Sequence, residues 1–173
     1  SNLIELMKSR LLVEKTLLNT IEVEGKMISI AEYFIQINKM REAWDKSPTL
    51  KNIQFLPNAD REKFTLQQDS ILKGIYSGLT APANLTIAQK DKKVSITSIE
   101  VVSSNENFSK IFCENLAKET SEYYVEIKSK KARLNVEILQ KQTDSIRAEL
   151  NSAITGVASA ADNVFNLNMA MNV

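Results

Sequence analysis

The chain has 173 residues, a net charge of +1 and 43% hydrophobic residues. That length and composition allow one domain with a core of ordinary size, and the near-neutral charge gives no electrostatic argument for binding nucleic acid. Histidine is absent, which removes the commonest general base, the usual catalytic triad and most zinc sites. Four glycines and three prolines favour a helix-rich fold over one with many turns.

A first helix is predicted over residues 3–18, where the apolar side chains form one broad face. Asn2 stands at the position of its cap, and Glu5 stands where it would complete a capping box. Residues 8–10 (Lys-Ser-Arg) fall on the opposite side, which we expect to be solvated. A loop or a short extended piece is expected at 21–25.

A second helix is predicted from Ser29 to the residues before Pro48, because proline restricts the residue that precedes it. Glu32 again stands at the capping-box position. Trp44 closes the apolar stripe of this helix, and we expect it to be buried in the core.

The next stretch predicts a short strand and a third helix. Residues 52–56 are predicted as a strand that Pro57 stops. Asp60 is predicted to cap a helix that runs to about Gly78.

From 84 to 102 the apolar period changes from 3.6 to 2, which predicts a β-hairpin with a charged turn. The second strand, ending at 99–102, is the more apolar, so we expect it to lie further inside a sheet. Lys90, Lys92 and Lys93 at the turn are interpreted as edge protection and not as a binding patch.

A very long helix is predicted from about Asn105 to about Phe165, because no proline occurs there and the first glycine is Gly156. Its apolar residues recur at three- and four-residue steps, and opposite charges stand four residues apart. At 1.5 Å per residue, about 55–60 residues span roughly 80–90 Å, which exceeds a compact domain of this size. The aromatic-rich first part, to about Ile127, is expected to pack on the globular part.

These elements predict an α+β fold: a small α/β base containing the hairpin and three helices, plus one very long, protruding C-terminal helix. The predicted domains are a base at 1–127 and a helical stalk at 128–173 whose return helix is missing. The chain is expected to be a fragment of a longer protein.

The sequence contains no pattern for a catalytic, cofactor-binding or metal site, so neither an enzymatic activity nor a cofactor is predicted. The carboxylates of Glu114, Glu119 and Glu122 are interpreted as parts of solvated helix faces, without the apolar surroundings that a general acid needs. The lone Cys113 is interpreted as a buried, inert thiol.

Two features of the long helix are candidate contact sites. Ser152, Gly156 and Ala160 are small residues four apart, and such spacing lets the backbone of another helix approach closely; the alternative is a fraying helix end without a partner. Lys128 and Lys131 share a face on which a polyanion or an acidic sugar could bind. For these lysines a solvated helix face is the simpler interpretation.

Several segments resemble the periplasmic part of chain-length determinant proteins of the Wzz type, also called polysaccharide co-polymerases. Residues 4–15 (IELMKSRLLVEK) resemble the family's N-terminal segment, in which L-K-S-R leads into a helix. The strand ending at 98–102, followed at once by a helix with 115–117 (NLA) and 123–124 (YY), is similar to the family's passage from strand to helix. The long helix is the third similarity, and the variant resembles those of Bacteroides-like bacteria.

The resemblance implies an α/β base near the bacterial inner membrane and transmembrane helices before and after this chain. It implies a homo-oligomeric, non-enzymatic scaffold that works with a polysaccharide polymerase and the growing polysaccharide. Such a scaffold sets the chain length of O-antigen, capsule or related polymers in lipopolysaccharide or polysaccharide biosynthesis, and this part of it lies in the periplasm.

Two alternatives stay open. Related periplasmic domains occur in membrane tyrosine kinases of capsule systems, where a kinase domain follows on the cytoplasmic side. The chain could also be a helical adaptor of the membrane-fusion type, which predicts a coiled coil. A strict heptad repeat of apolar residues is not sustained across 128–165 in our interpretation, which counts against the adaptor.

Overall fold

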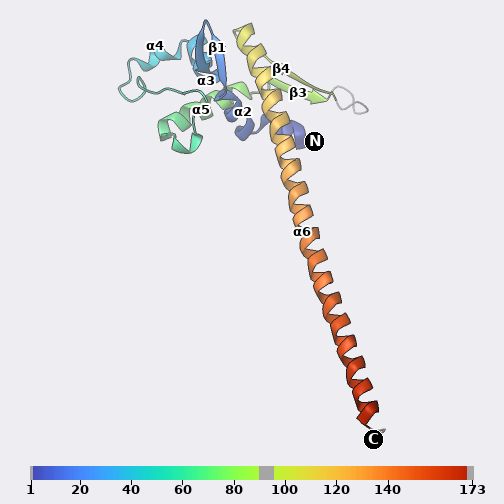
Figure 1. The fold of residues 1–173 in the computed structure, drawn as a ribbon. Coiled ribbons are helices and arrows are strands. Elements are labelled where there is room, and N and C mark those ends of the chain that lie inside the picture. Colours follow the sequence, from blue (N-terminus) through green and yellow to red (C-terminus); the bar gives the residue numbers. More distant parts are fainter. Residues whose placement is uncertain (1, 90–95, 171–173) are drawn as a thin grey trace. The chain divides into compact units, whose positions relative to one another are not determined.

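The computed structural model describes the backbone of residues 2–89 and 96–170, and the side chains of 3–89 and 96–164. It confirms the α+β class, with two small antiparallel sheets, several short helices and one long C-terminal helix (Figure 1). The elements are α1 (Asn2–Lys8), α2 (Arg10–Leu17), β1 (Thr20–Val23), β2 (Lys26–Ser29), α3 (Ile30–Ile37), α4 (Met40–Trp44), the 3-10 turn η1 (Arg61–Lys63), α5 (Leu66–Leu79), β3 (Leu85–Gln89), β4 (Thr97–Val101) and α6 (Glu106–Ala170).

Contacts divide the chain into two units, Ser1–Tyr124 and Val125–Val173, called here the N-terminal and C-terminal units. The backbone of α6 is helical without a break through both of them. The predicted start of this helix is confirmed, because the side chain of Asn105 accepts a hydrogen bond of 2.9 Å from the backbone N–H of Phe108.

Two predicted helices are each divided in the structure. Ser9 is extended and its side chain accepts from the backbone N–H of Leu12, so it caps a new helix, α2, and the prediction of one helix over 3–18 was wrong. Asn2 is the first residue of α1, not its cap. In the second case Lys39 adopts a left-handed conformation (φ 51°), which separates α3 from α4.

A hairpin replaces the loop or extended piece expected at 21–25. β1 and β2 pair antiparallel, with Thr20 opposite Ser29 and Val23 opposite Lys26. The two turn residues, Glu24 and Gly25, both have positive φ (51° and 76°), as the tight turns that match strand twist require. The short polar turn Glu-Gly was the signal in the sequence.

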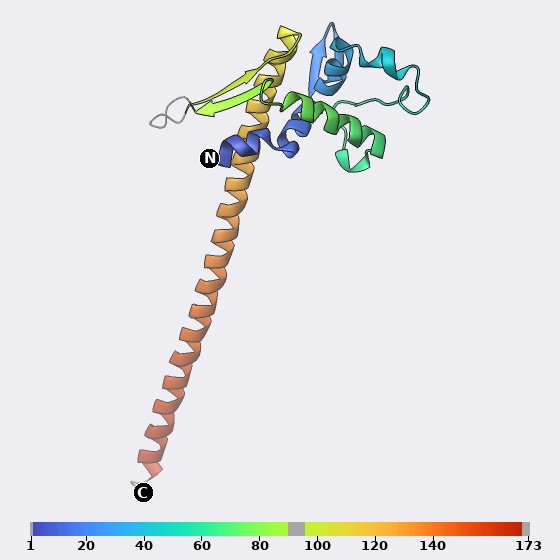
Figure 2. The ribbon, with the colours of Figure 1, turned by 180° about the vertical axis from the view of Figure 1, so that it is seen from behind.

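The hairpin predicted at 84–102 is confirmed, with β3 and β4 in antiparallel register from Leu85 opposite Val101 to Gln89 opposite Thr97 (Figure 2). The expectation about its strands was wrong: β3 buries Leu85 and Ile87, whereas the residues of β4 are half-buried or exposed. The lysines predicted at its turn lie outside the described residues.

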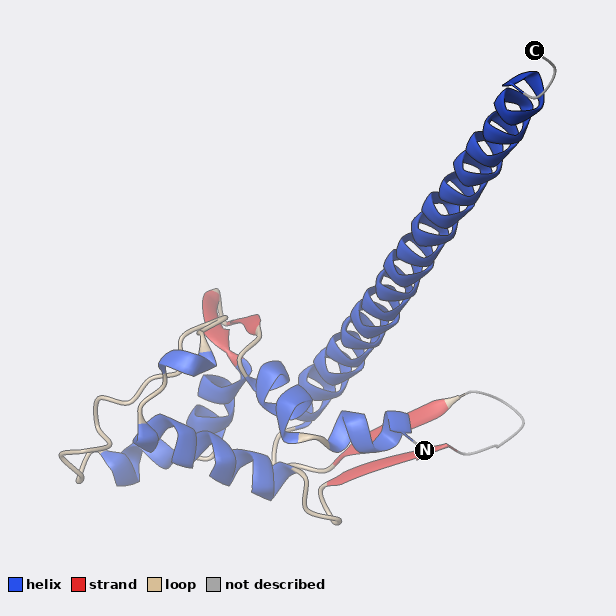
Figure 3. Cartoon of the chain, turned by 90° about the horizontal axis from the view of Figure 1, so that it is seen from below, coloured by secondary structure: helices blue, strands red, loops and turns tan. Residues whose placement is uncertain are grey.

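Residues 52–56 form a loop, so the predicted strand was wrong (Figure 3). Side chains of α3 and its cap bind this backbone in place of a neighbouring strand: Ser29 Oγ donates to the carbonyl of Phe55 at 2.6 Å. Asp60 caps only η1, and α5 begins six residues later behind Thr65, which forms a capping box with Gln68.

The core of the N-terminal unit gathers residues from its helices, from β3 and from the first turns of α6. Three residues of α6 reach it with no exposed surface, namely Phe108, Phe112 and Leu116. Phe108 stacks on Phe112 with ring centroids 5.8 Å apart. The apolar residues from the other segments that have no exposed surface are Leu12, Val13, Leu17, Ile30, Ala31, Ile35, Phe55 and Leu72.

Candidate functional site

Buried carboxylates form the centre of two polar clusters in the N-terminal unit. The side chain of Glu119 is 5% exposed, so its predicted place on a solvated helix face was wrong, whereas Glu114 and Glu122 are exposed as expected. Glu119 accepts a hydrogen bond of 2.9 Å from the amide of Asn19, and its other carboxylate oxygen lies 2.9 Å from Lys15 Nζ. These contacts join α2 and its C-terminal end to α6.

The second cluster joins α2, η1 and α5 through two arginines and two carboxylates. Glu14, which is 1% exposed, pairs with Arg10 and with Arg61, whose Nε lies 2.7 Å from its Oε2. Asp69 pairs with the same two arginines, at 3.0 Å and 2.9 Å. Arg10 is therefore part of a network and not simply solvated, which corrects the expectation for residues 8–10.

The neighbours of Asp69 and Arg10 in this second cluster favour the ionised form of these two groups. Hydrogen bonds from Arg61 and then Arg10 lower the pKa of Asp69, and the hydrogen bond to Glu14 raises the pKa of Arg10. A general acid needs the opposite shift, a raised carboxyl pKa. The arrangement around Asp69 therefore favours a structural role.

An open hollow of about 380 Å³ lies beside these clusters. Its walls come from α2, from the turn after α2 and from the loop that leads to η1: Leu11, Lys15, Leu18, Asn19, Asn58, Ala59, Asp60 and Arg61. Lys15 and Arg61 at its wall are already engaged with Glu119, Glu14 and Asp69.

Among the described side chains, no group of three or more Cys, Asp or Glu residues is placed to hold a metal ion. Within the same ranges no helix is both long enough and apolar enough to cross a membrane.

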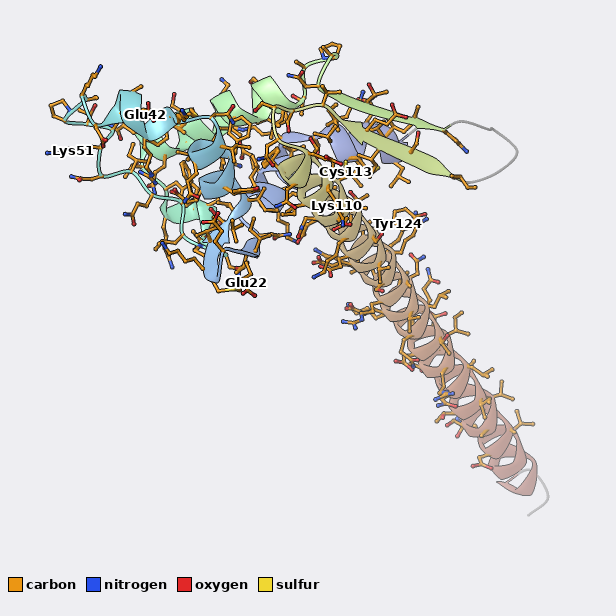
Figure 4. The ribbon with its side chains drawn as sticks, turned by 90° about the horizontal axis from the view of Figure 1, so that it is seen from above. Glu22, Glu42, Lys51, Lys110, Cys113 and Tyr124 are labelled. Carbon is orange, nitrogen blue, oxygen red and sulfur yellow. The ribbon has the colours of Figure 1, made fainter. Side chains whose placement is uncertain are left out.

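The thiol of Cys113 lies on α6 next to β4, with its Sγ 3.9 Å from the carbonyl of Ile99 (Figure 4). Burial raises its pKa, so little thiolate forms at neutral pH.

The predicted contact residues of the C-terminal unit are all exposed. Ser152, Gly156 and Ala160 follow one another at four-residue steps on an unbroken helix, and a Cβ added at Gly156 would meet nothing within 4 Å. Lys128 and Lys131 are also exposed. The structure thus leaves the small-residue patch open for an approaching helix.

The most extensive feature of the C-terminal unit is a row of exposed apolar side chains. Every residue described from 125 to 164 is exposed, including large apolar ones such as Leu139, Ile146 and Leu150, at 61%, 66% and 56%. Six of the large apolar residues, together with Ala132, Thr143, Ala153 and Ala160, lie at alternating three- and four-residue steps, the spacing of a coiled coil. Strict heptads across the whole of 128–165 stay an open question, but one register runs from Ala132 to Val164 with Thr143 as its polar member.

This register was present in the sequence, but it is obscured by apolar residues on other faces, such as Ile127, Leu134 and Ile138. The register becomes visible when steps of four and three residues are followed from Ala132.

Comparison of the chain with protein-family models, with curated proteins and with solved structures finds no match. The fold and its exposed features therefore define the chain only as an α+β unit with a long helix that carries an uncovered apolar face.

Proposed function

We propose that the chain is the periplasmic part of a polysaccharide co-polymerase, an oligomeric scaffold that sets the chain length of a bacterial surface polysaccharide. The observation that carries this proposal is the uncovered apolar face of α6 between 125 and 164. Large exposed apolar faces are typical of surfaces that bind another protein. The resemblance of residues 4–15 and of the passage from β4 into α6 supplies the class of scaffold.

A helix in a protein draws most of its stability from packing against neighbouring elements, and a helix without such packing is only marginally stable in water. Every residue described from 125 to 164 of α6 is exposed, so a partner helix would supply packing that this stretch lacks in the described chain. In the proposed scaffold the partner is another copy, and the copies stand side by side in one membrane. The polymerase and the growing polysaccharide then meet a surface of fixed size.

The scaffold has no catalytic step of its own in this proposal, since the polymerase performs the chemistry. Lys128 and Lys131 are the candidate contacts for an acidic polymer, because both are exposed on the same stretch of α6. Small residues at 152, 156 and 160 are the candidate contacts between helices.

Two measurements test the proposal. The full-length protein in detergent should sediment as an oligomer across a concentration series, and a strict monomer would overturn the scaffold. Deleting the gene should change the length distribution of the surface polysaccharide on a gel while synthesis continues. An unchanged distribution would remove the proposed role in chain length.

The sustained heptad register also favours the alternative of a helical adaptor more than the sequence interpretation allowed. An adaptor would carry no transmembrane helix before this chain and would leave polysaccharide length unchanged on deletion. Reading the gene on both sides of the chain distinguishes the two, and a phosphate-binding loop downstream would indicate the kinase.

A further inference from the structure

The exposed face of α6 contains one continuous coiled-coil seam, defined here by ten positions. Steps of four and three residues alternate along it without a break, and every member except Thr143 is apolar. Its a positions are Val136, Thr143, Leu150, Val157 and Val164, and its d positions are Ala132, Leu139, Ile146, Ala153 and Ala160.

The seam is long enough to form a stable interface. Its six large members are 56–71% exposed, and burying such side chains on two helices would remove on the order of 1,000 Å² of apolar surface from water. That area reaches the size expected of a specific protein interface. The d positions Ala153 and Ala160 are small, so the two backbones can approach closely there.

The flanks of the seam accept a second copy of the same helix in parallel. In that arrangement each g residue faces the e residue of the next heptad of the other copy. Asn135 then faces Gln140, and Gln142 faces Arg147, so no like charges oppose each other within the seam. Lys128 and Arg133 would form one like-charged pair, at the exposed end, where salt screens it.

We propose that this seam binds the same seam of a second copy of the chain as a parallel, two-stranded coiled coil. Valine occupies three of the five a positions, which is one part of the pattern of two-stranded coiled coils; the other part, leucine at d, occurs at Leu139. The parallel orientation rests on the proposed function, in which all copies are anchored in one membrane. Of the predicted contact residues, Ala160 lies in the seam and Gly156 on its flank at a g position, while Ser152 lies outside it.

Cysteine cross-linking tests the pairing and its orientation. Cys113→Ser supplies the background, and Val157→Cys adds a thiol at an a position, where two copies in parallel bring their thiols within bonding reach. The matched control is Thr155→Cys, two residues away at the outward f position. Under mild oxidation the Val157→Cys variant should form disulfide-linked dimer at least several-fold faster than the control.

A third variant separates a failure of pairing from a failure of folding. Leu150→Asp, added to Val157→Cys, should abolish the cross-link while the fluorescence of Trp44, which is buried in the N-terminal unit, stays native. Persistence of the cross-link in this variant would contradict the seam.

The experiment is run on the 173-residue chain and on the full-length protein in membranes. Equal rates for Val157→Cys and Thr155→Cys in both, or no cross-link in either, would overturn the pairing. A cross-link only between Leu139→Cys and Val157→Cys chains, which face each other when the two seams overlap in opposite directions, would show antiparallel helices and overturn the orientation. If the full-length protein stays oligomeric but forms no cross-link, the proposed pairing of the seam is refuted and the proposed function is not. If the full-length protein is a strict monomer in detergent, the proposed function is refuted.

Discussion

The carboxylate of Glu32 holds the loop at 53–55 against α3, and its removal should destabilise the N-terminal unit. One oxygen accepts a hydrogen bond of 2.7 Å from the backbone N–H of Phe55, and the other pairs with Arg41. Arg41 in turn donates to the carbonyl of Ile53 at 3.0 Å. A single buried side chain therefore satisfies a backbone that has no strand beside it.

The expected magnitude follows from which groups lose a partner. In Glu32→Gln the amide can still accept from Phe55, but the charged pair with Arg41 is lost, and hydrogen bonds to charged groups contribute about 1.5–3 kcal/mol. Because Arg41 is a third exposed, water replaces part of this, and we expect a loss of about 1–2 kcal/mol. Glu32→Ala also leaves the buried N–H of Phe55 without an acceptor, so the loss should reach about 3–4 kcal/mol.

Urea unfolding at pH 7, followed by the fluorescence of Trp44, measures these changes. Trp44 is the only tryptophan of the chain and is 7% exposed, so its signal reports on the N-terminal unit. Glu42→Gln on α4 is the matched control, since Glu42 is exposed and should change the free energy of unfolding by less than about 0.5 kcal/mol.

A double-mutant cycle isolates the ion pair. If Glu32 acts through Arg41, the losses in Glu32→Gln and Arg41→Gln should add to more than the loss in the double variant, by about 1 kcal/mol. The guanidinium of Arg41 lies 5.8 Å from the centre of the Trp44 ring, so circular dichroism must accompany fluorescence for these variants. A Glu32→Ala variant as stable as the control would refute the reasoning.

Three further predictions concern other parts of the chain. Arg61 and Arg10 lower the pKa of Asp69, so the stability that Asp69 gives the folded chain should be complete at neutral pH and be lost as the pH falls below the ordinary pKa of 3.8. Asp69→Asn should therefore lower the free energy of unfolding at pH 7. In the variant this free energy should also depend less steeply on pH in the acid range, as urea unfolding at several pH values would measure. Cys113, whose pKa burial raises, should react with iodoacetamide at pH 8 much more slowly in the folded chain than in urea, and equal rates would contradict its burial. Gly156→Leu should weaken assembly of the full-length protein in ultracentrifugation while leaving the Trp44 unfolding midpoint unchanged, because a Cβ added at Gly156 meets no described atom within 4 Å outside its own helix backbone. A shifted midpoint with intact assembly would reverse this interpretation.

The elements predicted most accurately are those with a clear apolar period and a capping or turn residue at the boundary that this period indicates. The start of α6 behind Asn105 and the antiparallel hairpin of β3 and β4 are confirmed for that reason. The predicted helices failed at Ser9 and Lys39, where apolar periodicity continues through a residue whose backbone leaves the helix. Apolar periodicity indicates which face of a helix is buried. It gives no sign of a single residue that interrupts the helix when the residues on both sides keep the same face buried.

The buried carboxylates were missed for a different reason. Glu32 fits a capping box by spacing, and its N–H does bond to Ser29 Oγ at 3.1 Å, yet its side chain turns to Phe55 and Arg41. Glu119 looks like one of several charges on a helix, yet Lys15 and Asn19 meet it from α2 and its C-terminal end. Asn19 lies 100 residues from Glu119 in the chain, and Phe55 lies 23 residues from Glu32. Local spacing carries no information about partners at such separations.

The uncovered face of α6 presents the reverse case, in which the sequence holds the pattern and the single chain lacks the partner. In the N-terminal unit the apolar residues of α6, such as Phe108 and Phe112, are covered by the chain's own core. From Val125 onward residues of equal hydrophobicity stay in water. Nine of the ten seam positions between Ala132 and Val164 are apolar, although solvent-exposed positions tolerate polar residues freely. In the proposed pairing another helix covers the seam, and the unit of structure for this segment is then an assembly and not one chain.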